Sequence, residues 1–509
     1  MSKGIALENQ GGPSKAGLLH TPNGTKSHAL TDRQVLIALA IFFAVAGMNW
    51  AAPEHLQADT TLQAIMSTQK VTLFYWGQDR FLNFFPFLLS WIANPRTNLF
   101  AHMIVMGTAF FLFLEVAADV ITKLRLPQDS ARYRTALFLG LTLTTLCMLG
   151  KGGLYTFAYD AQPYASSFLF MAYAVGLLNR PEPRAVHWLA AVTLTMVATG
   201  LNPSVILAYG AVCLYALLKQ RSFRLIALGF IALAGALFWQ KLVQPSISPN
   251  SLYFTVTPST LLQGLGGMAQ SYTQNIKSYW ISALLLLISA IGLTVTRCWG
   301  NTNLKVARLI AVTLAVGATV VFACNGWIAS NGFHFRYFFP LFIVIIAITA
   351  DGLMAIYDQY RPGSLTPFSI IAFIIIAITL AHHPTKLKDY VGFDSYSKIS
   401  EFSEREGIRL IAGDYWASWN IVLLMNKSKM ASPRVFGAAA RGEAMRPEIE
   451  SMIHQRLLAG FDVLALCIGA SEDDCLPQLH KTSGYHWIHT RSADCATTCD
   501  IYKAVDGKP

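Results

Sequence analysis

Apolar runs separated by short polar loops recur along the chain. Eleven of these runs approach the length that crosses a bilayer as a helix, roughly 17–25 residues. They cover residues 35–51, 98–116, 135–150, 164–178, 187–200, 204–218, 225–243, 279–296, 309–327, 340–357 and 367–382. The pattern predicts a mainly α, polytopic membrane bundle of about eleven spanning helices.

Composition supports this prediction. Of 509 residues, 54% are hydrophobic and 13% are charged, whereas soluble domains are about 25% charged. The formal charge of +11 comes largely from Lys and Arg in short loops between apolar runs, as membrane topology requires. We therefore expect the bilayer, and no nucleic acid, as a partner.

The distribution of basic residues predicts the orientation. One set of loops, with the N-terminal segment, holds 17 Lys and Arg, and the alternate set holds 7. The richer set is expected in the cytoplasm. Residues 1–33 then form a disordered cytoplasmic tail, residues 34–383 the membrane domain, and residues 384–509 a domain on the opposite face.

The C-terminal segment has its own pattern. Residues 408–412 and 463–468 read as buried strands and residues 446–460 as an amphipathic helix, which predicts a small α/β domain. Its cysteines suit an oxidising compartment and two disulfides. A zinc site is the alternative, although the spacings do not match paired CxxC motifs. The candidates are Cys467, Cys475, Cys495 and Cys499.

The first outer loop, residues 53–97, is long and holds two amphipathic or apolar pieces too short to span. Between them, aromatic rings, an amide, a carboxylate and a guanidinium occur together. Such a mixture suits a carbohydrate or a lipid head group, and an interfacial aromatic belt is the alternative. These side chains belong to Tyr75, Trp76, Gln78, Asp79 and Arg80.

Two later outer loops repeat this chemistry. The loop at 151–163 begins at a lysine, and the loop at 329–339 carries an arginine at the expected interface. A guanidinium there can bind two phosphate oxygens, or it can reach lipid phosphates outside any site. The candidates are Lys151, Tyr159, Asp160, Gln162, Tyr164, His334, Arg336 and Tyr337. Two carboxylates inside predicted spans, Glu115 and Asp351, are expected to form structural pairs.

The organisation of the chain resembles the GT-C glycosyltransferases. The likeness is carried by YWGQDRFLNFFPFL (residues 75–88), YDAQPYASS (159–167) and HFRYFFP (334–340), with a long first outer loop and an outer C-terminal domain. Protein mannosyltransferases, the lipid A aminoarabinose transferase and serotype-converting phage glucosyltransferases share this plan. The resemblance implies transfer of a sugar from a polyprenyl-phosphate donor to a glycan, lipid or protein acceptor of the cell envelope. It also implies a bacterial inner-membrane location with the C-terminal domain in the periplasm.

The resemblance also implies roles for residues. Family members often place an acidic pair soon after the first helix, whereas here Glu54 and Asp59 are five apart and Asp79 follows later. Asp79 is the first choice as the base because its neighbours carry the strongest likeness, with Glu54, Asp59 and Asp160 as alternatives. Donor phosphate binding would fall to Arg336, Arg80 and Lys151. Sugar or acceptor binding would fall to Tyr75, Trp76, Gln78, Tyr159, Gln162, Tyr164, His334 and Tyr337.

A single carboxylate base without a covalent step predicts inversion at the anomeric carbon. Because the carboxylates are dispersed, no obligatory metal cofactor is expected, although some relatives use a divalent metal. Two other functions remain open on sequence alone: a flippase or transporter of lipid-linked sugars, and a polysaccharide polymerase or ligase. The first would favour internal repeats and broken mid-membrane helices, and no clear repeat is found.

Overall fold

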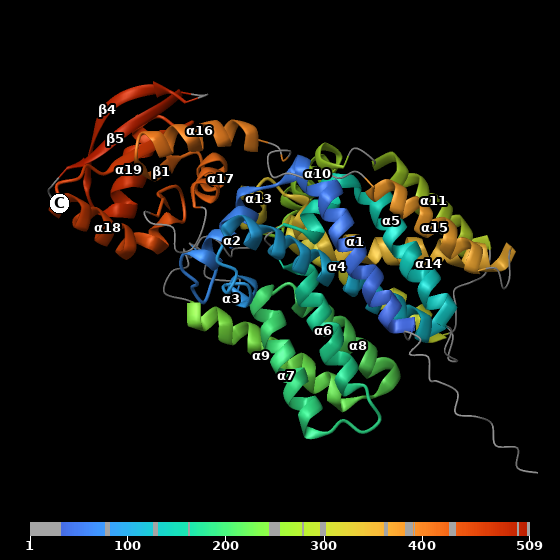
Figure 1. Cartoon of the computed structure of the whole chain (residues 1–509). Helices are drawn as coiled ribbons and strands as arrows, with labels where there is room; N and C mark the ends of the chain where they lie inside the picture. The colour runs from blue at the N-terminus through green and yellow to red at the C-terminus, as the bar shows by residue number, and fades with distance from the viewer. Residues whose placement is uncertain are drawn as a thin grey trace, which may run out of the picture.

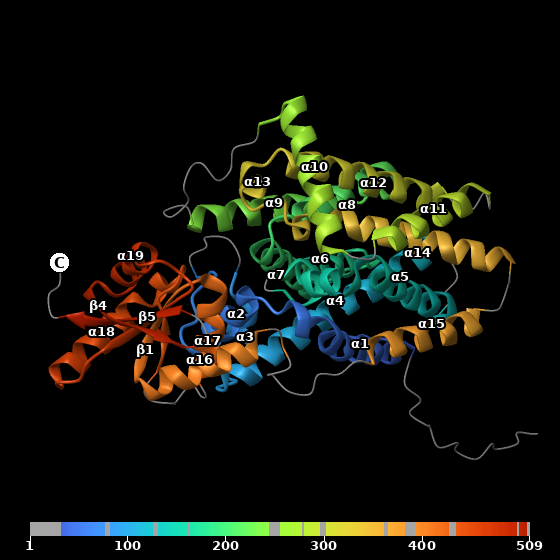
Figure 2. The same ribbon diagram turned by 90° about the horizontal axis from the view of Figure 1, so that it is seen from above.

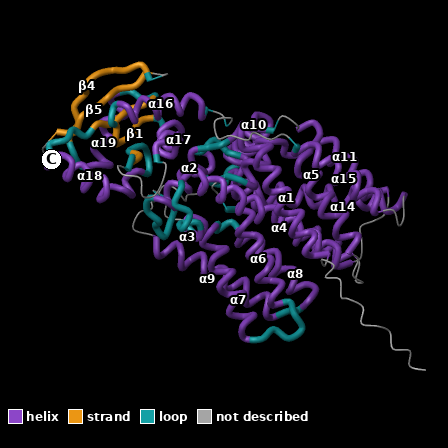
Figure 3. Tube along the Cα trace, in the orientation of Figure 1, coloured by secondary structure: helices purple, strands orange, loops and turns teal. Residues whose placement is uncertain are grey.

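The computed structural model has two parts, a large helical bundle and a smaller α/β domain at one end of it (Figures 1 and 3). Figure 2 shows the same arrangement from above, with α1 running from the far end of the bundle towards the α/β domain. The structure describes residues 32–76, 82–125, 131–160, 163–243, 255–276, 279–295, 302–360, 365–381, 390, 392–426, 434–495 and 498–505. The predicted tail lies almost wholly outside these residues.

Each of the eleven predicted runs coincides with a helix. These helices are α1 (Asp32–His55), α4 (Pro95–Arg125), α5 (Ala131–Ala158), α6 (Tyr164–Leu178), α7 (Ala185–Leu201), α8 (Val205–Tyr215), α9 (Phe223–Val243), α11 (Tyr279–Val295), α12 (Thr302–Ala323), α14 (Phe339–Tyr360) and α15 (Leu365–Leu380). Among the described residues, five helices are long and apolar enough to cross a membrane, and the other six are shorter apolar helices. The mainly helical membrane-type fold is confirmed, whereas the number of spans and the orientation stay predictions.

Two helix boundaries differ from the sequence expectation. The helix predicted to end at residue 150 continues as α5 to Ala158, so Lys151 lies on a helix rather than in a loop. The chain kinks at Gly150, whose φ of 60° and ψ of −164° suit glycine. The first outer loop is also shorter than predicted, because α1 reaches His55 and α4 begins at Pro95.

The segment between α9 and α11, where we predicted no helix, contains α10 (Pro258–Asn275). Its start is encoded locally. Thr257 accepts a hydrogen bond from the Thr260 amide at 3.1 Å, and a proline occupies the first helical turn. Both are helix-start signals, so this element was readable from the sequence.

The first outer loop folds into a layer between the bundle and the α/β domain. It contains α2 (Ala58–Thr68), every residue of which is buried, and the short α3 (Phe84–Leu88). The amide of Leu82 donates to the Gly200 carbonyl at 2.9 Å, which fixes the loop against the end of α7. A short α13 (Gly326–Ser330) and the 3₁₀ turn η4 (Phe335–Phe338) precede α14 on the same side.

The C-terminal domain is built on a five-stranded sheet in the order β2-β1-β3-β5-β4. β1 is parallel to β2 and β3, whereas β5 is antiparallel to β3 and β4. The strands are β1 (Ile408–Gly413), β2 (Phe436–Gly437), β3 (Leu464–Ile468), β4 (His486–Asp494) and β5 (Thr498–Val505). The helices are α16 (Phe393–Arg405), α17 (Tyr415–Met425), α18 (Arg446–Leu458) and α19 (Glu472–Ser483). The predicted α/β character, both strands and the helix at 446–460 are therefore present.

The four C-terminal cysteines form two disulfides, Cys467–Cys475 and Cys495–Cys499, each with a Cα–Cα distance of 6.2 Å. The first joins the end of β3 to α19. The second closes the turn between β4 and β5. Both lie within the small domain and none reaches the bundle.

Hydrogen bonds from the first outer loop hold the small domain in place. Gln69 donates to the Val435 carbonyl at 3.1 Å, and Lys70 donates to the Ala444 carbonyl at 2.9 Å. On α4, Arg96 donates to the Leu424 carbonyl at 3.0 Å. α17 packs on α2, so the small domain lies over the residues that follow α1.

Candidate active site

Asp59 lies at the centre of a buried polar cluster. It is in the first turn of α2, where the helix dipole favours a carboxylate. One carboxylate oxygen, Oδ1, accepts hydrogen bonds from the Tyr415 hydroxyl and from Arg441 Nη1, the latter at 3.0 Å. The main-chain carbonyl of Asp59 accepts a hydrogen bond from the Tyr75 hydroxyl at 2.8 Å. Two elements of the small domain therefore hold a carboxylate of the first outer loop.

Arg336 joins Asp59 to a second carboxylate. It lies in η4, and its Nη1 is 3.3 Å from Asp160 Oδ2 and 3.7 Å from Asp59 Oδ2. Asp160 follows the end of α5, and its side chain is fully buried. Arg336 Nε is buried and has no hydrogen-bond partner among the described residues. Because a buried N–H is costly to leave unpaired, this guanidinium has spare capacity for an oxygen of a ligand.

Aromatic rings enclose Arg441. Its guanidinium carbon is 5.0 Å from the ring centre of Tyr75 and 5.2 Å from that of Tyr415, within cation–π distance. Its backbone has a φ of 78°, an unusual value for a non-glycine residue and one that concentrates at functional sites. The surrounding fold therefore holds Arg441 in a strained position facing Asp59.

Burial fixes the protonation of the two phenols. Burial, followed by the negative charge of Asp59, raises the pKa of Tyr75 and of Tyr415. Burial acts to lower the pKa of Arg441. The electrostatic effects of Tyr75, Asp59 and Tyr415 act in the opposite direction and are larger together, so the pKa of Arg441 is raised. Both phenols therefore stay protonated as donors, and Arg441 stays cationic.

His334 acts on the backbone beside Arg336. Its Nδ1 accepts a hydrogen bond from the Arg336 amide at 3.3 Å, and its ring stacks on Phe335 with centres 5.2 Å apart. Burial, followed by the positive charge of Arg336, lowers the pKa of His334 to about 4. The imidazole is therefore neutral at physiological pH. Tyr337 lies beside it, with the Arg336 guanidinium 5.4 Å from its ring centre.

Glu54 and Lys151 pair with each other, which ties the end of α1 to α5. The Glu54 side chain is 53% exposed and that of Lys151 is 29% exposed, in contrast to the buried Asp59 and Asp160. Of the described candidate bases, Asp59 and Asp160 are the enclosed ones, and both lie within reach of Arg336.

Three aromatic side chains that we predicted for sugar or acceptor binding are enclosed by protein. Tyr159 is fully buried and donates from its hydroxyl to the Ala44 carbonyl at 2.8 Å. Tyr164 stacks on Phe339. Trp76 packs against a buried tryptophan of α17, Trp419, with ring centres 6.1 Å apart. All three rings are buried, and their role in sugar or acceptor binding stays a prediction.

Four sequence candidates lie outside the described residues: Gln78, Asp79, Arg80 and Gln162. Their assigned roles stay predictions. In the other direction, sequence reasoning missed Arg441, which stands in a segment of small residues with Glu443 as its nearest acidic residue. The contact of Tyr415 with Asp59 was not predicted either.

Among the described residues, no group of three or more His, Cys, Asp or Glu side chains is placed to hold a metal ion. The two carboxylates of the cluster face arginines. Metal dependence is untested by this geometry and stays a prediction.

No protein-family model matches the chain, and no curated protein matches it significantly. Solved structures do. The crystal structure of ArnT from Cupriavidus metallidurans bound to undecaprenyl phosphate aligns over 94% of this chain and 99% of its own, with 13% identity and a TM-score of 0.51. The apo crystal structure of that protein aligns over 92% and 97%, with 12% identity and a TM-score of 0.49. At such identity, the similarity establishes a shared fold along nearly the whole chain.

Proposed function

Given that the chain has the GT-C fold, we propose that it is a membrane glycosyltransferase using a polyprenyl-phosphate-linked sugar donor. The observation that carries the proposal is the buried cluster of Asp59, Asp160, Arg336 and Arg441 at the junction of bundle and small domain. It joins a carboxylate able to take a proton with a guanidinium able to hold a phosphate. The similar ArnT structure contains undecaprenyl phosphate, which supports a carrier of this class.

Asp59 is the base in this proposal. Its Oδ1 accepts hydrogen bonds from Tyr415 and Arg441. Among the described residues, its Oδ2 has Arg336 Nη1 at 3.7 Å as its ion-pair partner, which is longer than a good hydrogen bond. Oδ2 is the oxygen from which an acceptor hydroxyl would be deprotonated. Arg441 and Tyr415 hold the carboxylate in one orientation, which general-base catalysis requires.

Arg336 is the phosphate-binding residue. As the acceptor oxygen bonds to the anomeric carbon, the bond from that carbon to the phosphate oxygen breaks, and its electron pair moves to the leaving polyprenyl phosphate. A guanidinium can bind two phosphate oxygens and stabilise that developing charge. The unpaired Nε of Arg336 supplies one such donor without breaking its contact with Asp160. A single displacement of this kind inverts the anomeric centre.

The finer parts of the proposal follow the predicted orientation. The cluster lies on the side that carries the C-terminal domain, which the loop charges place outside the cytoplasm. The acceptor would be a glycan, lipid or protein of the cell envelope, and the transferred group a hexose or pentose. The protein would reside in a bacterial inner membrane with its small domain in the periplasm.

The test is donor turnover by purified protein in liposomes. A panel of polyprenyl-phosphate sugars is supplied, and release of polyprenyl phosphate is followed for wild type, Asp59→Asn and Asp79→Asn. The matched control is Asp473→Asn, which makes the same chemical change at an exposed position of α19. Loss of a general base typically costs about 10²–10⁴-fold, so we expect that loss in Asp59→Asn alone.

The other outcomes separate the alternatives. If Asp79→Asn loses turnover and Asp59→Asn keeps it, the class stands and the base is Asp79. If wild type consumes no donor but moves lipid-linked sugar across the bilayer, the glycosyltransferase proposal is wrong and a flippase replaces it.

A further inference from the structure

A cavity lies at the end of the bundle that is remote from the small domain. It has a volume of about 820 Å³, within the range of ligand pockets in proteins. α4 begins beside the small domain, where Arg96 contacts Leu424, and it reaches the cavity only over residues 115–124. At 1.5 Å per helical residue, the cavity is roughly 30–40 Å from that contact. It is therefore separate from the Asp59 cluster, and no step proposed above uses it.

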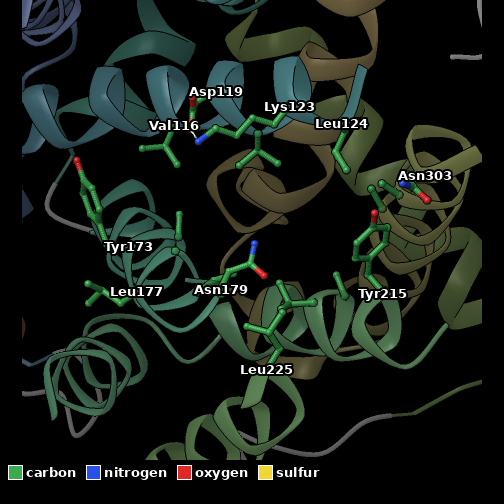
Figure 4. A pocket seen from close by; sticks show the side chains of 18 of the residues that line it. Val116, Asp119, Lys123, Leu124, Tyr173, Leu177, Asn179, Tyr215, Leu225 and Asn303 are labelled. Atoms are coloured by element: carbon green, nitrogen blue, oxygen red, sulfur yellow. Dashed lines mark hydrogen bonds and ion pairs between the residues drawn. The ribbon is translucent and has the colours of Figure 1, made fainter. Parts of the chain in front are cut away.

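The walls of the cavity are apolar and come from several helices. α4, α6, α8, α9 and α12 contribute Val116, Leu177, Val212, Leu225 and Ile310. Figure 4 shows Asp119 and Lys123 of α4 across the cavity from Asn179 and Leu225, with Tyr215 and Asn303 to one side. An apolar wall beside polar groups suits an amphipathic ligand.

The charges of the lining are unequal. Four cations and two carboxylates line the cavity, an excess of two positive charges: Arg33, Lys123, Arg134 and Arg180 against Glu115 and Asp119. Asp119 is already shared, because Lys123 Nζ lies 2.6 Å from it and Arg134 Nη1 lies 3.3 Å from it. Arg33 is exposed and the Lys123 side chain is 73% exposed, whereas Glu115 is buried. The cationic excess is therefore accessible from solvent or from lipid head groups.

We propose that this cavity binds an anionic glycerophospholipid from the leaflet on that side, which the loop charges predict to be the cytoplasmic one. The phosphate would contact Arg33 and Lys123, and an acyl chain would lie against the apolar walls. Basic pockets between membrane helices on the cytoplasmic side recognise anionic lipid head groups in this way. A zwitterionic lipid would not complement the positive excess. The inference does not depend on the sugar-transfer proposal.

The experiment measures bound lipid directly. Purified protein in detergent is supplied with phosphatidylglycerol or with phosphatidylethanolamine of the same acyl chains, and retained lipid is counted by native mass spectrometry. Wild type is expected to retain phosphatidylglycerol in preference to phosphatidylethanolamine. The double variant Arg33→Gln/Lys123→Gln is expected to lower that retention about tenfold or more. The control Arg132→Gln/Lys219→Gln, which removes two exposed cations outside the lining, is expected to retain it.

A variant without charge change tests the cavity itself. Gly176 lines the cavity, and a Cβ built there meets nothing within 4 Å. Gly176→Phe on helix α6 therefore fills the space while favouring the helix, and we expect it to lose the lipid with an unchanged unfolding midpoint. If the charge variant fails to fold, Gly176→Phe decides the question.

Three results would overturn the proposal. They are equal retention of the two lipids by wild type, undiminished phosphatidylglycerol in both the charge variant and Gly176→Phe, and stoichiometric displacement of phosphatidylglycerol by undecaprenyl phosphate. The last would make the cavity a site for the isoprenoid carrier.

Discussion

Two buried clusters of arginine and aspartate in the described part of the chain are built differently. In the first, the carboxylate of Asp351 in α14 pairs with two arginines. One oxygen lies 2.7 Å from Arg125 Nη1 of α4, and the other pairs with Arg308 of α12. In the second, the Asp59 cluster, one oxygen carries two donors and the other has a long contact to Arg336. The first cluster is saturated and rests on regular helices. The second is built from loops and turns and leaves bonding capacity unused.

The contrast teaches how to separate a structural ion pair from a reactive one. Both are buried and both contain two arginines, so burial and charge do not distinguish them. The distinguishing features are an unpaired Nε on Arg336 and a strained backbone at Arg441. Buried pairs are held by the cost of breaking them, whereas reactive groups must keep a donor or an acceptor for the substrate.

The largest effect is expected at the saturated cluster. Asp351→Ala leaves Arg125 and Arg308 as buried charges without their carboxylate, which typically costs about 3–5 kcal/mol. We expect the free energy of unfolding, measured in detergent by chemical denaturation, to fall by that amount. Asp473→Ala on the surface serves as the control. An unfolding free energy equal to that of wild type would contradict a structural role for Asp351.

The second effect concerns turnover rather than stability. Arg336→Lys keeps the charge but loses the planar fork that reaches Asp59, Asp160 and a phosphate together. Removing one donor of this kind typically lowers the catalytic rate about 10²–10³-fold. We expect that loss in the donor-release assay with little change in unfolding midpoint, and no loss in the exposed control Arg405→Lys. A large fall in stability with normal turnover per folded molecule would place Arg336 with the structural cluster.

A smaller effect is expected from the small domain. Arg441→Lys shortens the side chain, which weakens the contact with Asp59 Oδ1 and removes the guanidinium from between the rings of Tyr75 and Tyr415. A charge-assisted hydrogen bond is worth about 1.5–3 kcal/mol, so we expect roughly tenfold or greater loss of turnover. Arg446→Lys, at a half-exposed position of the same domain, should retain full turnover. Equal rates for the two variants would remove the small domain from the active site.

The smallest effect is a pH dependence at His334. Its pKa is lowered to about 4 in the folded protein, from the usual 6.5. As pH falls from 6.5 towards 4, the unfolded chain takes up a proton that the folded protein refuses beside Arg336, so stability falls across that window. His334→Gln should flatten the slope of unfolding midpoint against pH between 7 and 5, whereas the exposed His454→Gln should not. Identical slopes for wild type and His334→Gln would contradict this burial effect.

Much of the fold could be predicted from the sequence, because apolar runs of sufficient length must satisfy their backbone as helices in a membrane. All eleven runs fall on helices, and the strands at 408–412 and 463–468 are present. The error at Lys151 has a local cause. A polar Lys-Gly-Gly segment reads as a loop, yet Gly150 kinks the chain and the helix resumes.

Only part of the candidate site could be predicted from the sequence. Asp160 and Arg336 were named from outer-loop chemistry, and Asp59 was an alternative base that the GT-C resemblance implied. The structure brings these three together. Asp79 was preferred because its sequence neighbours carry the strongest likeness, but sequence neighbours do not show which residues lie close in space. Asp79 lies outside the described residues. Arg441 was missed because 382 positions separate it from Asp59. No local pattern encodes a contact made when two domains dock.

That separation also bears on how the protein is made. Asp59 emerges earlier in synthesis than Arg441, since domains form in the order in which the chain is produced. Until the small domain has folded, the carboxylate has no Arg441 and no Tyr415. A partly made chain, already inserted and carrying Asp59 and Arg336, therefore lacks a finished centre. The Asp59 cluster is therefore complete only after the small domain has folded against the bundle.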